Sequence, residues 1–211
     1  MESALREGGG APGLRLIETL RWEAGFVRLD RHLARMARGA AALGWDFPRD
    51  RVVAAMQAGR TGAERVRVTL SAQGEVEVTA GVFVPVAGPW RVGLAGERLR
   101  SDDPWLGLKT TRRGAYDRAR AALSGLDEAV LVNERGEVCD GTITTVFFDR
   151  GEGMRTPPLS CGLLPGVLRE EMLETGLCAE EVLRVEEVGS VRLWVGNSLR
   201  GLIPAEWVEV R

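Results

Sequence analysis

The stretch GEVCDGTITTVFF, residues 136–148, decides the fold of the second half of the chain. Its β-branched and aromatic residues predict a strand over 137–148, with Glu137 and Asp140 at its start. An apolar strand over 129–132 precedes it, and the intervening residues 134–136 are typical of a turn. A carboxylate at the beginning of such a strand either pairs with a cationic heterocycle or is an ordinary turn residue.

Outward from this hairpin, helix and strand signals alternate irregularly along the chain. Asp30 is expected to cap the first long helix and Gly44 to end it. This mixed order with many hairpins favours an α+β fold over a doubly wound α/β sheet. The expected elements are a flexible lead-in over 1–13, strands over 14–21 and 26–29, helices over 31–43 and after Pro48, a hairpin over 64–78, a strand over 91–94, helices over 112–123 and 167–175, and strands over 191–195 and 207–210.

A linker is expected at PVAGP, residues 85–89, because two prolines and a glycine interrupt strand continuity there. The chain of 211 residues is long enough for two small domains. We therefore predict a smaller N-terminal domain over 1–88 and a larger C-terminal domain over 89–211.

The composition is that of an ordinary globular protein, with 45% hydrophobic and 27% charged residues. A formal net charge of -2 argues against a nucleic-acid partner and against electrostatic attraction to a membrane. No apolar run is long enough to span a bilayer, and the charged, Gly-rich start does not resemble a signal peptide. Three cysteines without CxxC spacing predict no disulfide framework and no metal site, so we expect a cytoplasmic protein whose cysteines are buried hydrophobes.

Lys109 is the single lysine among 28 basic residues. A codon bias explains most of this skew, but arginine cannot replace lysine where a neutral amine must attack a carbonyl, because guanidinium stays protonated. The neighbouring Arg112 and Arg113 are expected to lower the pKa of Lys109, which favours the nucleophilic form. Lys109 is thus a candidate for amine chemistry. The alternative is that it is a surface lysine without a chemical role, retained by chance despite the codon bias.

Three further segments have the residues of an anion site. Arg35 lies on the first long helix with Arg31 and Arg38 at helical spacings, a set that suits a phosphate or simply faces solvent. His32 is interpreted as structural because no relay partner is near it in the sequence. Pro165 and Gly166 open a helix whose first amides are free to bind an anion. In GNSLRG, Ser198 has a hydroxyl donor and Arg200 a guanidinium that suits a carboxylate.

Taken in order, five segments resemble the class IV aminotransferase family, the fold type IV enzymes that use pyridoxal 5′-phosphate (PLP). They are RLDRHLARM, LKTT, CDGTITTVFF, CGLLPGVLRE and NSLRGLIP, and the resemblance runs from LIETLRW to SLRGLIPA. The family includes 4-amino-4-deoxychorismate lyases, branched-chain aminotransferases and D-amino acid aminotransferases. The resemblance implies two α/β subdomains with the cofactor cleft between them, and a homodimer.

The resemblance also implies roles for individual residues. Lys109 matches the catalytic lysine that holds PLP covalently, Arg35 a phosphate-binding arginine, and Asp140 the acidic residue that pairs with the pyridine nitrogen. Asp140 is preferred to Glu137 because the family register is an acidic residue, Gly, and then a hydrophobic-Phe pair. The amides of Val167 and Leu168 match a phosphate-binding helix start, Ser198 a phosphate-contacting hydroxyl, and Arg200 is expected to bind a substrate carboxylate.

The sequence departs from the family at three places: Asp140 replaces Glu, Thr145 replaces Asn, and Leu168 stands where Thr is frequent. The short length and the KTT and NSLRG segments favour 4-amino-4-deoxychorismate lyase, which releases pyruvate and leaves p-aminobenzoate. An amino-acid aminotransferase of branched-chain or D-amino acid type is the alternative. A non-catalytic PLP-family binding protein is a third, against which Lys109, Arg35 and Asp140 count.

Overall fold

A computed structural model describes residues 2–209 of the chain. The fold is mixed α+β, and the chain separates into two compact units. The first consists of Met1–Pro85 together with Leu108–Arg112, and the second of Val86–Gly107 together with Arg113–Arg211. A short segment that includes Lys109 therefore belongs to the first unit, although the chain on both sides of it belongs to the second.

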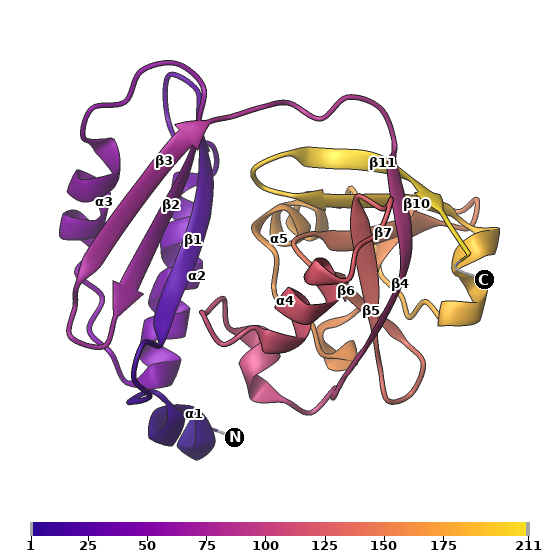
Figure 1. The fold of residues 1–211 in the computed structure, drawn as a ribbon, viewed down its shortest axis with the longest axis horizontal. Coiled ribbons are helices and arrows are strands. Elements are labelled where there is room, and N and C mark those ends of the chain that lie inside the picture. The colour runs from indigo at the N-terminus through magenta and orange to yellow at the C-terminus, as the bar shows by residue number, and fades with distance from the viewer. Residues whose placement is uncertain (1, 210–211) are drawn as a thin grey trace. The chain divides into compact units, whose positions relative to one another are not determined.

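The first unit is built on a three-stranded antiparallel sheet in the order β1-β2-β3 (Figure 1). Helix α2 packs its apolar face on β1, where Gly39 leaves room for the side chain of Leu16. Gly44 ends α2 in the left-handed conformation, as predicted. The elements of this unit are α1 (Glu2–Gly8), β1 (Arg15–Trp22), α2 (Leu29–Leu43), α3 (Arg49–Gln57), β2 (Glu64–Ser71) and β3 (Val76–Val82).

The segment Leu108–Arg112 runs antiparallel along the free edge of β1. The amide of Ile17 donates to the carbonyl of Lys109 over 2.8 Å, and the amide of Thr111 donates to the carbonyl of Arg15 over 2.9 Å. Leu16 and Thr110 form the bridge between these two hydrogen bonds. The backbone of Lys109 is thus fixed in an extended conformation by β1.

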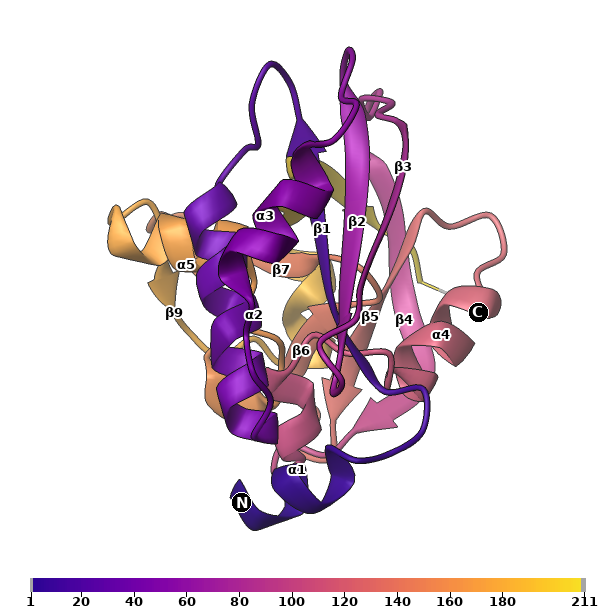
Figure 2. The same ribbon diagram turned by 90° about the vertical axis from the view of Figure 1, so that its left-hand side faces the viewer.

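The second unit contains an eight-stranded mixed sheet in the order β6-β5-β4-β11-β10-β7-β8-β9 (Figures 1 and 2). Apolar clusters cover this sheet, one of them beside α4 and another beneath α5. Its strands are β4 (Trp90–Leu99), β5 (Glu128–Asn133), β6 (Val138–Gly141), β7 (Thr145–Asp149), β8 (Met154–Thr156), β9 (Ala179–Glu180), β10 (Arg192–Asn197) and β11 (Gly201–Trp207). Its helices are α4 (Gly114–Ala121) and α5 (Val167–Glu174), with short 3-10 helices at Pro104–Gly107, Leu159–Cys161 and Val185–Ser190.

Several predicted elements differ from the structure. The lead-in over 1–13 contains α1, and the strand over 26–29 is absent except for a bridge between Trp22 and Phe26. Helix α2 begins at Leu29 after the left-handed Arg28, rather than being capped by Asp30. The strand over 137–148 is two strands, β6 and β7. The last strand ends at Trp207, and residue 210 of its predicted range lies outside the described residues.

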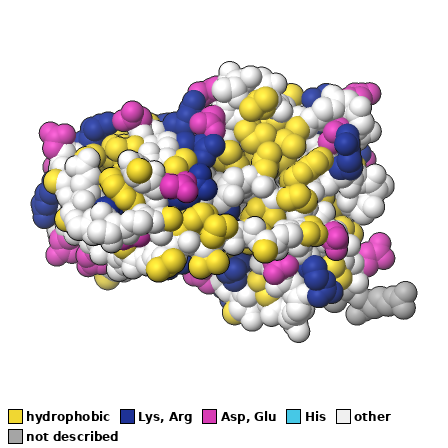
Figure 3. All heavy atoms as spheres, turned by 90° about the horizontal axis from the view of Figure 1, so that it is seen from above, with side chains coloured by type: hydrophobic (Ala, Val, Ile, Leu, Met, Phe, Trp, Pro, Cys, Tyr) yellow, Lys and Arg dark blue, Asp and Glu magenta, His cyan; other side chains and the backbone are white. Residues whose placement is uncertain are grey.

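The surface mixes charge of both signs with apolar side chains, as the face in Figure 3 shows. Val82 and Val84 are the most exposed large hydrophobic residues, at the end of β3 and just beyond it. Among residues 2–209, no helix combines the length and apolar composition that a membrane crossing requires.

Candidate active site

In the first unit, a buried carboxylate joins β1 to α2. Glu18 and His32 are each only 2% exposed, and Arg35 is buried beside them. Nε of Arg35 donates to Oε1 of Glu18 over 2.8 Å, and Nη2 donates to Oε2 over 2.7 Å. Nδ1 of His32 lies 2.6 Å from the same Oε2. Planar bidentate pairing of this kind fixes the direction of a guanidinium as well as its charge.

Charge compensation keeps this carboxylate ionised. Burial raises the pKa of Glu18, but the positive charge and hydrogen bonds of Arg35, helped by His32, more than offset it and lower the pKa to about 2. Arg35 is therefore not one of a set of solvated arginines on a helix face. The expectation that His32 has no nearby partner is wrong. Glu18, which lies 14 residues earlier on β1, is within hydrogen-bond distance of its Nδ1 in the folded chain.

In the second unit, Glu128 at the start of β5 organises the turn that follows Asp140. Glu128 is fully buried. Its Oε1 accepts the amides of Ala129 and Thr142, each over 3.0 Å, and the Thr142 hydroxyl. Its Oε2 accepts the amide of Ile143 over 3.1 Å and the hydroxyl of Thr144 over 2.8 Å. This carboxylate therefore accepts hydrogen bonds from three backbone N–H groups, of which the amide of Thr142 also donates to the carbonyl of Ala129 over 3.1 Å.

Gly141 makes this turn sterically feasible. A Cβ at this position would overlap the hydroxyl of Thr144 and lie 3.0 Å from Oε2 of Glu128. The Asp140-Gly141 pair thus places a buried carboxylate directly before a turn that has little room for a side chain at residue 141. The sequence does not point to Glu128, since a single glutamate before an apolar strand has no distinguishing pattern.

Three predicted binding elements meet beside this turn. Nδ2 of Asn197, at the end of β10, donates to the carbonyl of Ile143 over 3.0 Å, which fixes the adjacent buried Ser198 near the turn. A Cβ on Gly166 would touch the hydroxyl of Thr145, so the start of α5 is equally close. The side chain of Leu168 in turn borders Gly196 of β10. The start of α5, the Ser198 turn and the turn after Asp140 therefore adjoin one another within the second unit.

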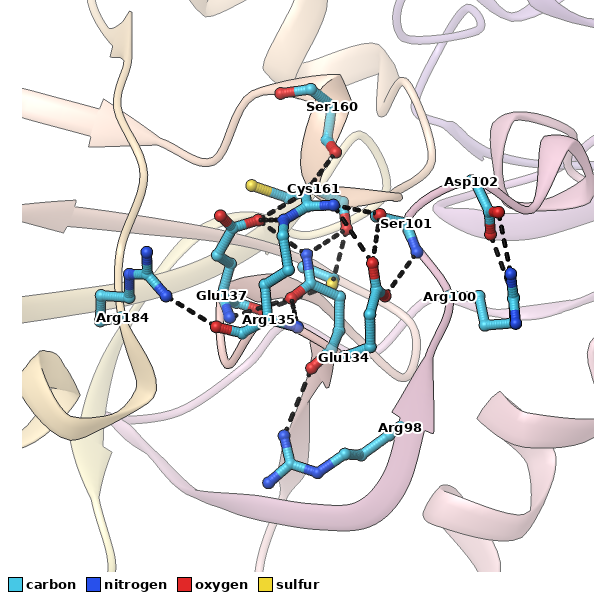
Figure 4. A network of polar contacts seen from close by, with 12 residues as sticks. Arg98, Arg100, Ser101, Asp102, Glu134, Arg135, Glu137, Ser160, Cys161 and Arg184 are labelled. Atoms are coloured by element: carbon cyan, nitrogen blue, oxygen red, sulfur yellow. Dashed lines mark hydrogen bonds and ion pairs between the residues drawn. The ribbon is translucent and has the colours of Figure 1, made fainter.

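Glu137, the alternative to Asp140, is engaged elsewhere. Its Oε2 accepts from Nη2 of Arg135 over 2.6 Å and from Nδ2 of Asn133 over 2.8 Å (Figure 4). The hydrogen bonds from Arg135 outweigh its desolvation and hold the pKa of Glu137 down to about 2. Glu137 is thus committed to the turn between β5 and β6.

The same network anchors the loop that leads toward Lys109. Both the amide and the hydroxyl of Ser101 donate to Glu134, over 2.9 and 2.6 Å, and Arg135 bonds to the Ser101 hydroxyl (Figure 4). Gly162 lies against this loop so closely that a Cβ would meet the Cα of Ser101 at 2.7 Å. The loop after β4 is therefore held by side chain and backbone contacts.

Two other candidate groups have definite surroundings. The guanidinium of Arg200 lies over the ring of Trp90, 5.7 Å from its centroid. The backbone amide of Arg200 donates to Oδ1 of Asn197. The three cysteines are buried and form no disulfide. Burial raises the pKa of Cys161 to about 12, so it is not a reactive thiolate near neutral pH.

The donor set of the second unit fits PLP. Helix α5 begins at Gly166 without a side-chain cap, so the N–H groups of its first turn and the positive end of the helix dipole suit an anion such as a phosphate. The buried Ser198 adds a hydroxyl donor, and the buried Asp140 adds a carboxylate suited to a protonated ring nitrogen. In the first unit, taken by itself, the backbone of Lys109 is held by β1.

The chain is similar to known proteins of one family. The model of the family described as "Amino-transferase class IV" matches residues 15–207. A Schizosaccharomyces pombe protein named "Putative aminodeoxychorismate lyase" is 31% identical over 180 residues, which are 79% of this chain and 76% of the relative.

Solved structures extend the comparison to the fold. A Mesorhizobium loti structure named "Putative amino-acid aminotransferase" is 44% identical, with a TM-score of 0.89 over 92% of this chain and all of that one. A branched-chain aminotransferase structure from Thermotoga maritima, also named as putative, has a TM-score of 0.81 at 22% identity, over 98% of this chain and 80% of the other. The chain belongs to the class IV aminotransferase family and is a PLP-dependent enzyme with the fold of that family.

Proposed function

We propose that the protein is a 4-amino-4-deoxychorismate lyase, which releases pyruvate and leaves p-aminobenzoate. The observation that carries this choice is the extent of the sequence match. The Schizosaccharomyces pombe relative named as a lyase aligns over 79% of this chain, whereas the curated relatives named as branched-chain aminotransferases align over 28–38% of it. A second relative named as a lyase, from Bacillus subtilis, aligns over 39%.

Residues of the second unit would bind and orient the cofactor. The amides of Val167 and Leu168 and the hydroxyl of Ser198 would bind the phosphate, because all three adjoin one turn. Asp140 would hold a proton at the pyridine nitrogen by charge attraction. The engagement of Glu137 with Arg135 and Asn133 supports Asp140 for this role.

Residues of the first unit would complete the site. The guanidinium of Arg35 would contact the phosphate from the fixed direction that Glu18 imposes on it. PLP supplies an electron sink for a substrate carbanion when bound. The ε-amine of Lys109 would hold the cofactor and then serve as general base at the substrate carbon, while Arg200 would bind a substrate carboxylate. The active form is proposed to be a cytoplasmic homodimer, as the family resemblance implies.

An amino-acid aminotransferase is the second candidate, favoured by the printed name of the 44% identical Mesorhizobium loti structure. In that reaction Lys109 would transfer the proton from the substrate Cα, with 2-oxoglutarate as the acceptor of the amino group. A non-catalytic PLP-binding protein is disfavoured by the presence of Lys109, Arg35 and Asp140 together.

The test combines binding with product analysis. Purified protein is mixed with PLP, and the visible absorption band of covalently bound cofactor is recorded, followed by borohydride reduction and peptide mapping. The label is expected on Lys109, the single lysine, and Lys109→Ala is expected to lose both band and label. Persistence of the band in Lys109→Ala contradicts the assigned site.

The bound enzyme is then offered aminodeoxychorismate in one assay and a panel of amino acids with 2-oxoglutarate in another. Formation of pyruvate and p-aminobenzoate in equal amounts is the expected result. Formation of glutamate without p-aminobenzoate would establish the aminotransferase instead, and formation of neither product would contradict both candidate reactions.

A further inference from the structure

The side chain of Thr145, the first residue of β7, is buried beside the start of α5. Thr145 is only 5% exposed. A Cβ on Gly166, the N-cap residue of α5, would lie 2.6 Å from Oγ1 of Thr145. Because threonine is branched at Cβ, few side-chain conformations are open to it, so the hydroxyl is held in place on the strand. The Thr145 hydroxyl therefore lies against the residue at which α5 begins.

This close approach explains the glycine at residue 166. Gly166 has a φ of -68° and a ψ of 136°, an extended conformation that any residue adopts. Conformational freedom is therefore not the reason for glycine here. Space is the reason, because a Cβ would come too close to the Thr145 hydroxyl for a real contact. Thr145 and Gly166 thus form a matched pair that keeps a hydroxyl at the helix start.

The Thr145 hydroxyl has no hydrogen-bond partner among residues 2–209. Two threonines of the preceding turn differ in this respect, since the hydroxyls of Thr142 and Thr144 both bond to Glu128. A buried hydroxyl normally has a partner, because leaving its hydrogen bond unmade costs free energy. The Thr145 hydroxyl is therefore available as a donor to a bound molecule at the start of α5.

The first two residues of α5 contribute backbone donors but no polar side chain. Val167 and Leu168 are both buried and apolar, and Leu168 packs in a cluster with Phe147 and Met172. The guanidinium of the next residue, Arg169, bonds to the carbonyl of Pro157 and to Glu180. A hydroxyl donor beside these amides therefore has to come from another element, and β7 supplies it through Thr145.

The strand beside β7 brings a second hydroxyl to the same place. Strands β7 and β10 are antiparallel neighbours, and Thr145 pairs with Gly196 near the end of β10 (Figure 1). The buried Ser198 follows two residues later. A Cβ on Gly196 would lie 3.1 Å from Cδ2 of Leu168, so this end of β10 also adjoins the start of α5. Two hydroxyls and the first amides of α5 therefore lie close together within the second unit.

We propose that Thr145 is a further phosphate-binding residue, whose hydroxyl donates to the phosphate of PLP beside the amides at the start of α5. This inference rests on the proposed function, in which the phosphate binds at α5 and Ser198. A phosphate group has several oxygens that accept hydrogen bonds, and bonds to a charged acceptor are stronger than bonds to a neutral one. All the groups involved belong to the second unit.

The test compares two substitutions of Thr145 in the full-length protein. Thr145→Val removes the hydroxyl, keeps the shape and suits a strand, whereas Thr145→Ser keeps a hydroxyl. Thr175→Val is the matched control at the other end of α5, where the Thr175 hydroxyl donates to the carbonyl of Glu171 over 2.8 Å. Dissociation constants are measured for PLP and for pyridoxal, which has the same ring and aldehyde but no phosphate. A third readout is the rise in the unfolding midpoint that inorganic phosphate causes in the PLP-free protein.

We expect Thr145→Val to bind PLP about tenfold more weakly than the wild type and to bind pyridoxal equally well. It should also be stabilised less by inorganic phosphate. Thr145→Ser and Thr175→Val should match the wild type in all three readouts. If Thr145→Val does not fold, Thr145→Ala replaces it with the same expectations.

Three results would overturn the inference. One is an unchanged PLP dissociation constant in Thr145→Val. Another is an equal loss of affinity for PLP and pyridoxal, since a purely structural effect does not depend on the phosphate. The third is a Thr145→Ser variant that binds PLP as weakly as Thr145→Val, because the lost methyl group rather than the hydroxyl would then matter.

The two proposals fail in different ways. If the wild-type protein binds neither PLP nor inorganic phosphate, the proposed function and the inference fail together. If wild-type Lys109 is labelled after borohydride reduction and Thr145→Val binds PLP as tightly as the wild type, only the role of Thr145 fails.

Discussion

Glu18 in the first unit and Glu128 in the second are both buried carboxylates, yet they are stabilised by different partners. Glu18 is bonded to a guanidinium and an imidazole. Glu128 is surrounded mainly by neutral amides and hydroxyls, with one guanidinium nitrogen of Arg120 at 3.5 Å. The first arrangement orients a cation, whereas the second shapes a turn of the backbone. The comparison shows that a buried carboxylate can either orient a charged side chain or hold a turn of the backbone in one conformation.

The largest effect is expected from Arg35→Ala, which removes the main cation of Glu18. An ionised carboxylate left in the interior without its partner is costly, so the free energy of unfolding of the PLP-free protein should fall by about 4 kcal/mol. Urea denaturation measures the change. Arg38→Ala is the control, because Arg38 is an exposed arginine on the same helix. Equal effects from the two variants would show that Glu18 does not depend on Arg35.

The second prediction concerns pH and separates the two acids. The pKa of Glu18 is lowered from 4.5 to about 2, so its contribution is complete above pH 4.5 and is lost as the pH falls toward 2. A difference of this size corresponds to about 3 kcal/mol. Unfolding free energies measured between pH 6 and pH 3 should fall more steeply for the wild type than for Glu18→Gln. Parallel curves would contradict the assigned charge.

Glu128→Gln is expected to cost about 2 kcal/mol, since one carboxylate oxygen becomes an NH₂ group facing N–H and O–H donors. At least one buried amide of the turn then loses its acceptor. Urea denaturation measures the loss, and hydrogen exchange should quicken at the amides of Thr142 and Ile143. Glu97→Gln, at an exposed pair on β4, is the control and should leave the denaturation midpoint unchanged. Unaltered exchange at both amides would refute the role given to Glu128.

The smallest effect is expected from Gly141→Ala, at about 1.5 kcal/mol, because the added methyl group is small but overlaps the Thr144 hydroxyl, which must shift and weaken its bond to Glu128. The neighbouring contact to Glu128 should also lengthen, which weakens the turn. Gly96→Ala on β4 is the matched control, since nothing lies within 4 Å of its Cβ position. Thermal unfolding compares the two. Equal thermal unfolding midpoints for Gly141→Ala and Gly96→Ala would show that the turn accommodates a methyl group at residue 141 without strain.

The two acids also mark the limit of sequence-based prediction. Helical spacing identifies Arg35 as a candidate, but it cannot reveal Glu18, which lies on a strand 17 residues earlier. The β-branched run after Gly141 predicts one continuous strand, whereas the structure has a turn between β6 and β7. The reason is that Glu128 accepts the amide of Ile143 and the hydroxyls of Thr142 and Thr144, which holds residues 142–144 in a turn between the two strands.

Local signals succeed where the cause is local. Gly44 ends α2 because glycine readily adopts the left-handed conformation, and the hairpin of β2 and β3 follows from alternating apolar residues. The ordered set of five segments predicts the family, which the family match over residues 15–207 confirms. The networks around Glu18 and Glu128 depend on side chains that meet only after folding, and no spacing rule contains them.

The edge position of Leu108–Arg112 has a consequence for cutting the chain in two. A proteolytic nick within residues 85–89 would leave the larger fragment still supplying a strand to the sheet of the smaller one, through the bonds of Lys109 and Thr111 to β1. The smaller fragment produced alone would lack that strand and present a bare β1 edge to solvent. Separately expressed halves should therefore be soluble and properly folded only when they are mixed. Pairing of the Leu108–Arg112 segment with β1 would be the contact that restores the fold in such a complementation experiment.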